Sequence, residues 1–305
     1  MIYLALAIVC SSSIALIFKH SETAGMNRYA VTTANYLMAA ALSAGLLGIT
    51  GLTMPDGGFS LGASLAELRS VFVLTGDKLP VASSALWAVI VGLGAGAFFF
   101  LAFIYYQKSI REQGVGLAGA FIKLGILVPM SLSLVLWQEF PTTIQWIGIA
   151  LALLSIVIVH WPSELNAGRA IRLSLVLLFL FGGIAEFSNK VFQKYGWLEH
   201  QSLFLLVTFA SAFGYSLVTT LRSSRATQRR DLLTGLMVGV PNLFSSFFLI
   251  RALETVPAAV AFPAFGAGTI LVINLVGVTV FGERLNRLEK AAVGLTILAL
   301  VLINQ

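Results

Sequence analysis

Charged residues are scarce in this chain: they make up 10% of its 305 residues, whereas 58% are hydrophobic. An ordinary soluble domain carries about 25% charged residues. A soluble fold of this length has too few charges to cover so much apolar surface. Disorder is excluded as well, because disordered chains combine low hydrophobicity with high charge. The composition therefore indicates a membrane protein with many spans.

Cysteine and the common catalytic patterns are scarce too. The chain has one cysteine, Cys10, which excludes an internal disulfide framework and a cysteine-cluster metal site. It has no Walker A sequence, and its three histidines share no metal-ligand spacing. No stretch shows the pattern of a nucleophile with its base. We therefore expect no cofactor, no metal and no enzymatic activity.

Long apolar runs are what the sequence has instead. A transmembrane helix needs about 20 apolar residues, and runs of this kind recur along the chain. A membrane-spanning β-barrel would alternate apolar and polar residues, whereas Leu173–Phe181 is almost continuously apolar. We predict an all-α integral membrane protein with ten transmembrane helices. They lie at 2–18, 29–51, 84–106, 114–137, 142–161, 171–192, 201–221, 232–252, 257–281 and 287–303.

The distribution of positive charge predicts the orientation. The formal net charge is +6, and 13 of the 19 lysines and arginines fall at odd-numbered connections, against five at even-numbered ones. Cytoplasmic loops are enriched in lysine and arginine, so we expect the odd connections in the cytoplasm and both termini outside. Because the basic residues are spread over many short loops, we expect no nucleic-acid partner.

An internal repeat divides the chain. The stretches LVLWQEFPTTIQWIGIALALLSIVIV and VTVFGERLNRLEKAAVGLTILALVLI match, so that Glu139 and Glu283 take equivalent positions. The two repeats cover 1–161 and 171–305, with 52–83 inserted into the first. Because each repeat has five spans, the second is inverted relative to the first. Inverted repeats are typical of secondary transporters, whose substrate site lies near the bilayer midplane.

The insertion at 52–83 has a helical pattern of its own. Ser64 with Glu67 forms a capping-box pattern. Four apolar residues recur nearby at helical spacing: Leu61, Leu65, Leu68 and Phe72. We predict a short amphipathic helix that lies at the membrane interface. An ordered soluble loop is the alternative.

Several stretches resemble one family. They read FKH at 18–20, ANYLMA at 34–39, GVGLAGAFIKLGILVP at 114–129, GVPNLFSSFFLIRAL at 239–253, and FPAFGAGTILV followed by FGERL within 262–285. Together with the five plus five spans, they resemble the drug/metabolite transporter superfamily in its EamA-type branch, and within it a bacterial subgroup of ten-span proteins. The resemblance covers nearly the whole chain except the insertion.

This resemblance implies a transporter of the inner membrane. It does not identify the substrate, because the superfamily carries amino acids, nucleotide sugars, drugs and other metabolites. It also conflicts with the charge bias, because related ten-span transporters usually have cytoplasmic termini.

Lys123 is the most informative charge, because it lies near the middle of the fourth span. A charge at that depth costs about 2.5–3.5 kcal/mol on insertion scales. Gly116, Gly119 and Ala120 share its helix face, which lets neighbouring helices approach closely. We interpret Lys123 as a substrate contact that faces inward. A buried structural lysine, satisfied by helix-end carbonyls or a fixed glutamate, is the alternative.

The sixth span supplies the next candidates. Glu186 and Lys190 lie four residues apart, with Asn189 beside them, so both charges share one helix face. We interpret Glu186 as a site for protons or for a cationic group, with an ion pair at a wet helix end as the alternative. Asn35 and Asn242 are weaker candidates that bind either the substrate or another helix.

Three further residues are candidates for gating or for structure. Glu139 and Glu283 lie in turns, which favours a structural role, with gating as the alternative. Pro263 lies inside the ninth span, where it frees a backbone carbonyl. Phe121, Phe262 and Phe265 are candidates for the lining of a pocket, although most of the 22 phenylalanines are expected to pack or to face lipid.

Together these observations predict a secondary active transporter that moves a small polar or zwitterionic metabolite by alternating access. Its partners are the lipid bilayer and a small-molecule substrate, and both proton coupling and substrate exchange are compatible driving forces. A non-transporting membrane scaffold or regulator is the alternative, although it needs no charge at midplane depth. An integral-membrane enzyme is a weaker one, because we find no acid–base pair or metal site near a membrane face.

Overall fold

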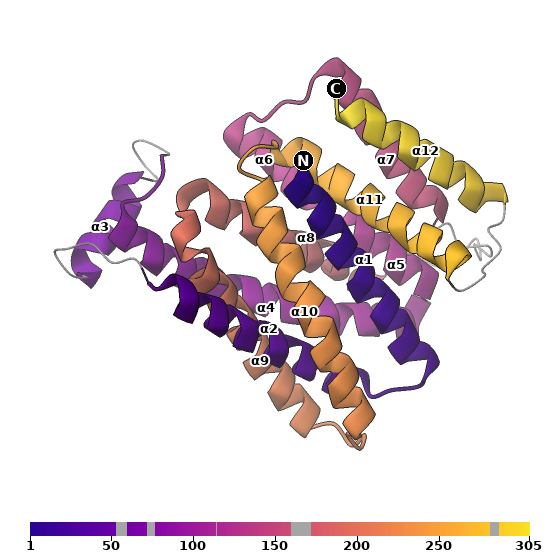
Figure 1. Ribbon diagram of the computed structural model, residues 1–305, viewed down its shortest axis with the longest axis horizontal. Coiled ribbons are helices and arrows are strands. Elements are labelled where there is room, and N and C mark those ends of the chain that lie inside the picture. Colours follow the sequence, from indigo (N-terminus) through magenta and orange to yellow (C-terminus); the bar gives the residue numbers. More distant parts are fainter. Residues whose placement is uncertain (53–59, 72–76, 114, 160–171, 281–286) are drawn as a thin grey trace. The chain divides into compact units, whose positions relative to one another are not determined.

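The computed structural model describes residues 1–52, 60–71, 77–113, 115–159, 172–280 and 287–305. Within these ranges every regular element is a helix (Figure 1). The helices are α1 (Ile2–Thr23), α2 (Arg28–Thr50), α3 (Leu61–Ser70), α4 (Val81–Gln113), α5 (Val115–Leu124), α6 (Leu127–Trp137), α7 (Thr143–Val159), α8 (Leu173–Tyr195), the 3-10 turn η2 (Leu198–His200), α9 (Gln201–Leu221), α10 (Arg229–Ala252), α11 (Ala258–Thr279) and α12 (Arg287–Ile303).

Within the described ranges, each of the ten apolar runs predicted from the sequence overlaps a helix, and the fourth run overlaps two, α5 and α6. Eight helical stretches of the described residues are long and apolar enough to cross a membrane. α7 and α12 have 17 residues each, which is the lower end of the length that spans a bilayer. The prediction of an all-α integral membrane protein is therefore confirmed, and crossing by α7 and α12 stays a prediction.

The chain divides into two compact units, each built from separate stretches of sequence. Unit 1 comprises Met1–Ser12, Phe98–Phe187 and Ala252–Gln305. In it, α7 packs beside α12 and α6 packs beside α11 (Figure 1). A Cβ added at Gly148 of α7 would lie 3.0 Å from the carbonyl oxygen of Ala299 in α12. The absence of a side chain there lets the two helices approach closely.

Unit 2 comprises Ser13–Ala97 and Ser188–Arg251. Here α2 packs beside α9, and the rings of Tyr36 and Phe209 stack with centroids 6.4 Å apart. α10 also meets α2, because a Cβ added at Gly239 would lie only 2.6 Å from the carbonyl oxygen of Asn35.

Three of these helix pairs are related in the same way by the order of the spans. In order of the spans, α2 and α9 are the second and seventh, α6 and α11 belong to the fourth and ninth, and α7 and α12 are the fifth and tenth. Each of these three pairs joins one span to the span five places later, which is its equivalent in the predicted repeat, whereas α7 also packs on α11 and α10 on α2, which are not equivalents.

The insertion contains a helix, as predicted, but its cap differs from the prediction. The N-cap of α3 is Ser60, whose side chain accepts a hydrogen bond from the backbone N–H of Ala63. Ser64 is buried inside the helix, and Glu67 accepts a hydrogen bond from Ser83 rather than returning to a cap. The helix begins one turn earlier than the capping-box pattern indicates, because Ser60 already satisfies a first-turn amide.

One face of α3 packs and the other is exposed. Leu68, Val71 and Leu79 form a small apolar core, on which Trp87 and Tyr195 of unit 2 also pack. Two other predicted positions of the apolar stripe, Leu61 and Leu65, are exposed, and Phe72 lies outside the described residues. A helix is thus present in the insertion, but of the four predicted stripe residues only Leu68 is seen to be buried, and both the amphipathic character of the helix and its place at the membrane interface stay predictions.

Candidate functional site

The fourth span is interrupted next to Lys123. α5 ends at Leu124 and α6 begins at Leu127. Pro129 explains the break, because it has no N–H and its ring clashes with the carbonyl four residues earlier, that of Gly125. The carbonyl oxygen of Gly125 instead accepts from the N–H of Val128 at 3.0 Å. The sequence predicted one continuous helix over 114–137, although Pro129 already signalled the break.

The break packs tightly against α8. A Cβ added at Gly183 would lie 2.5 Å from the carbonyl oxygen of Gly125, and one added at Gly125 would lie 3.2 Å from the backbone nitrogen of Gly183. Two backbones approach here because neither carries a side chain. Glu186 follows Gly183 by one helical turn, so the close approach fixes its position beside the break.

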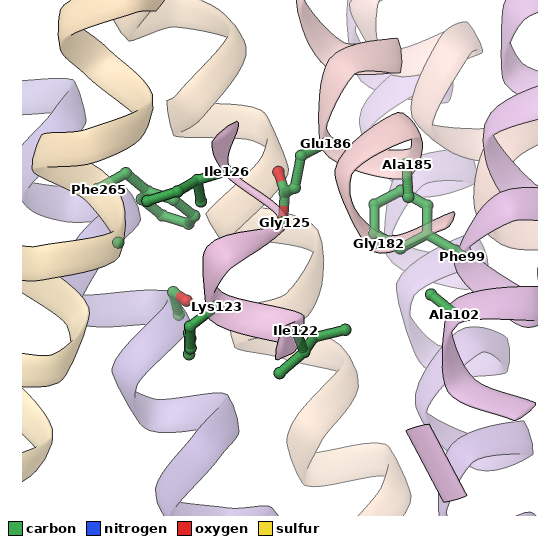
Figure 2. Close-up of a pocket in the computed structure, with 12 residues that line it drawn as sticks. Phe99, Ala102, Ile122, Lys123, Gly125, Ile126, Gly182, Ala185, Glu186 and Phe265 are labelled. Atoms are coloured by element: carbon green, nitrogen blue, oxygen red, sulfur yellow. The ribbon is translucent and has the colours of Figure 1, made fainter. Parts of the chain in front are cut away.

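A cavity of about 140 Å³ lies at this point within unit 1 (Figure 2). Helices α1, α4, α5, α8 and α11 contribute to its lining together with the break between α5 and α6. The lining residues are Ser11, Phe99, Ala102, Ile122, Lys123, Gly125, Ile126, Gly182, Ala185, Glu186, Phe265 and Gly266. Ten of these twelve residues are uncharged.

The two charged lining residues have opposite signs. Lys123 and Glu186 are both half-buried, and the structure brings them to one cavity; their role as substrate contacts stays a prediction. Such a cavity complements a ligand that carries an anionic and a cationic group. Its volume holds several water molecules but lies below the roughly 300–1,000 Å³ typical of drug-sized ligands.

The other predicted substrate residues lie outside this cavity. Asn189 and Lys190 follow Glu186 on α8 and are buried, with 1% and 3% of their surfaces exposed, but they belong to unit 2. Asn35 and Asn242 also belong to unit 2, where Asn242 Nδ2 donates to Asn35 Oδ1 at 3.0 Å. That bond joins α2 to α10, which favours the helix-packing interpretation of this pair.

The residues predicted for gating or structure do not line this cavity, as far as the structure describes them. Glu139 Oε2 accepts from the backbone N–H of Ala258, the first residue of α11, at 2.6 Å. This carboxylate satisfies an amide that has no partner within its own helix, and it suits the positive end of the helix dipole. Pro263 lies within α11, two residues before Phe265 of the cavity. Glu283 lies outside the described residues.

The sequence reasoning missed most of the small residues of the site. Ser11 and the pair Gly182–Gly183 were not singled out, although the glycine pair stands three residues before Glu186. Gly266 was missed as well, and a Cβ there would lie 2.7 Å from Ile126 Cδ1. The chain has 28 glycines, and their helix positions alone do not show which ones face a cavity.

Comparison with known proteins gives a family match over part of the chain. The model of the Small Multidrug Resistance protein family matches residues 202–298, a range that runs from α9 into α12. This match indicates a membrane transporter rather than an enzyme. It supports the drug/metabolite transporter resemblance in its coarse form, whereas the EamA-type branch stays a prediction.

A solved crystal structure of a protein shares the fold. It aligns over 99% of this chain and 94% of its own, with a TM-score of 0.66 and 17% sequence identity. At that identity the likeness concerns the fold alone. No curated protein matches the sequence.

Proposed function

We propose that this chain is a secondary active transporter of the inner membrane that moves a small polar or zwitterionic metabolite. The observation that carries the proposal is the cavity at the break of the fourth span, where Lys123 and Glu186 are the two charged lining residues. Charged residues inside membrane spans are costly and commonly mark substrate or ion pathways. Lys123 holds a carboxylate or phosphate, and Glu186 holds an amine.

The size of the cavity favours a small substrate. A space of about 140 Å³ fits a metabolite of a few heavy atoms better than a drug-sized compound, which needs a pocket of roughly 300 Å³ or more. The apolar remainder of the lining, including Phe265 and Ile122, excludes water and strengthens the electrostatic contacts of both charges.

Alternating access follows from the proposed repeat architecture. The packing of the second span on the seventh, the fourth on the ninth and the fifth on the tenth supports two inverted repeats that interlock. Discontinuous helices near the midplane are a common feature of substrate sites in such transporters, and the break at Gly125 supplies one. Proton coupling through Glu186 or substrate exchange drives the cycle.

A binding screen and a flux assay test this proposal. The purified protein is first screened by thermal shift against a metabolite library, since a ligand of the folded state raises its melting temperature. The best ligand is then used, radiolabelled, in proteoliposomes with wild type, Lys123→Met, Glu186→Gln and the double variant. Arg222→Gln is the control, because Arg222 is an exposed arginine at the end of α9.

The expected result is loss of flux in both single variants, with monodisperse folded protein in each. Lys123→Met keeps most of the apolar stem and removes only the charge. Full transport by this variant would contradict the assignment of Lys123. If Lys123 and Glu186 are instead a purely structural pair, each single variant strands a charge at a typical cost of 3–5 kcal/mol, and the double variant recovers stability.

A further inference from the structure

Unit 2 contains a second cavity, which the proposed transport site does not use. Its volume is about 380 Å³, within the range typical of ligand pockets. It lies where three spans end: the last turn of α2, the beginning of α9 and the last turn of α10. Leu46 and Leu198 give it apolar walls. The cavity therefore lies near one membrane surface rather than at midplane depth.

Arg251 supplies the cavity with a positive charge. Its guanidinium carbon lies 4.9 Å from the centroid of the Phe247 ring, and both residues line the cavity. The Nε atom of Arg251 is buried and has no hydrogen-bond partner among the described residues. A guanidinium stays charged at any physiological pH, and its planar fork matches the geometry of a carboxylate.

Gln201 supplies an acceptor beside that charge. The residue is 1% exposed, and its Nε2 donates to the backbone carbonyl of Phe247 at 2.7 Å. This bond fixes the orientation of the amide and leaves Oε1, which is buried without a partner in the described part of the chain. Buried acceptors are rarely left unsatisfied, so a ligand that brings an N–H or O–H group fits here.

Glu199 narrows the class of ligand further. It lines the same cavity and is exposed at its rim. Its negative charge opposes a simple anion such as inorganic phosphate, whereas it favours a ligand that also carries a donor. The cavity thus offers a guanidinium for an anion, two acceptors for a donor, and apolar walls for a hydrocarbon body.

We infer that this cavity is a second binding site, for a small organic acid that carries an amine or hydroxyl group beside its carboxylate. The carboxylate binds Arg251, the donor binds Gln201 Oε1 or Glu199, and the hydrocarbon part lies against Leu46 and Leu198. The inference does not rest on the proposed function, because Lys123 and Glu186 belong to a different cavity in unit 1.

Matched probes with one hydrocarbon body test the site. The purified full chain is placed in nanodiscs of phosphatidylcholine, whose headgroup has neither a carboxylate nor an N–H or O–H donor. Calorimetry then measures binding of L-leucine, 2-hydroxy-4-methylpentanoate, 4-methylpentanoate, 3-methylbutylamine and inorganic phosphate. In the Lys123→Met/Glu186→Gln double variant, which removes both charges of the proposed transport site, we expect the two acids with a donor to bind most tightly, 4-methylpentanoate about tenfold more weakly, and the amine and phosphate not to bind.

Further substitutions in this double variant assign the contacts. Arg251→Gln should weaken binding of both acids that carry a donor at least tenfold, and Arg251→Lys should weaken it less, because the charge stays while the fork is lost. Gln201→Met should weaken 2-hydroxy-4-methylpentanoate but leave 4-methylpentanoate unchanged. Arg222→Gln, which removes an exposed arginine from the same unit, should bind as the double variant does.

Three results would overturn the inference. They are absence of binding of every acid to the double variant, unchanged affinity on addition of Arg251→Gln, and binding of 3-methylbutylamine to the double variant as tight as that of the acids. Size-exclusion chromatography and the melting temperature establish that each variant is folded. If Arg251→Gln does not fold, unchanged affinity on addition of Arg251→Lys overturns the role of the guanidinium fork.

Discussion

The fourth and ninth spans are equivalents in the proposed repeat, yet proline acts differently in each. In the fourth span Pro129 is the third residue of a new helix, where its missing N–H costs nothing. In the ninth span Pro263 lies inside a helix that continues without a break. Every residue of Ala258–Ile270 is buried, so other side chains pack around α11 both before and after Pro263.

A proline in a membrane span therefore does not by itself interrupt the helix. The interruption occurs where glycines replace supporting side chains, at Gly125 and Gly183. The continuous span has a cap at its start, from Glu139, and tight packing around its proline. The fourth span therefore contributes an interrupted helix to the site, and the ninth contributes a continuous one.

The largest expected effect on stability comes from filling the contact behind the break. Gly183→Ala places a Cβ 2.5 Å from the Gly125 carbonyl oxygen and from Val128 Cβ, neither of which moves easily. Overpacking of this kind costs about 1–3 kcal/mol, and thermal unfolding in detergent measures it. Gly214→Ala is the control, because an added Cβ there meets no described atom within 4 Å. This control variant should be as stable as the wild type or more stable.

Equal melting temperatures for Gly183→Ala and the wild type would contradict the close approach of Gly183 to Gly125.

A smaller loss of stability is expected from removing the cap at the start of the ninth span, α11. Glu139→Ala removes the acceptor of the Ala258 N–H, and the loss of a helix cap costs about 0.5–2 kcal/mol. Glu139→Gln keeps an acceptor oxygen and removes the charge, so it should lie between Glu139→Ala and the wild type. The same thermal unfolding assay ranks the three proteins. A Gln variant less stable than the Ala variant would refute the capping role.

Alanine in place of either proline has the smallest expected effect on stability, and flux and hydrogen exchange distinguish the two variants. Pro129→Ala restores an N–H that the Gly125 carbonyl can accept, so α5 and α6 can join. Hydrogen exchange at Ile126 and Val128 should then slow, and flux should fall because the break is lost. Both Pro129→Ala and Pro263→Ala should change stability by only about 0.4–1 kcal/mol, through the unfolded chain. Flux through Pro263→Ala should stay near that of the wild type, and equal loss in both variants would end the contrast between the spans.

The sequence predicts the helices well because apolar length is a strong signal in a membrane protein. The same signal hides the break at Gly125, because a local change of hydrogen-bond pattern at two residues does not change the hydropathy of the run. Lys123 and Glu186 could be found because isolated charges stand out in apolar spans. The pairing of Asn35 with Asn242 could not, because nothing local indicates that α2 meets α10. The insertion shows a similar limit, since Ser60 and Ser64 are both plausible caps until the start of the helix is known.

The bond between Glu139 and the start of α11 also constrains how the protein is made. Its two partners are 119 residues apart in sequence. At translation rates of about 5–20 residues per second, roughly 6–24 s pass between synthesis of the carboxylate and of the amide that it caps. During that interval the chain that forms α7, α8, α9 and α10 is synthesised. The cap of α11 therefore forms late, after most of the chain has been made.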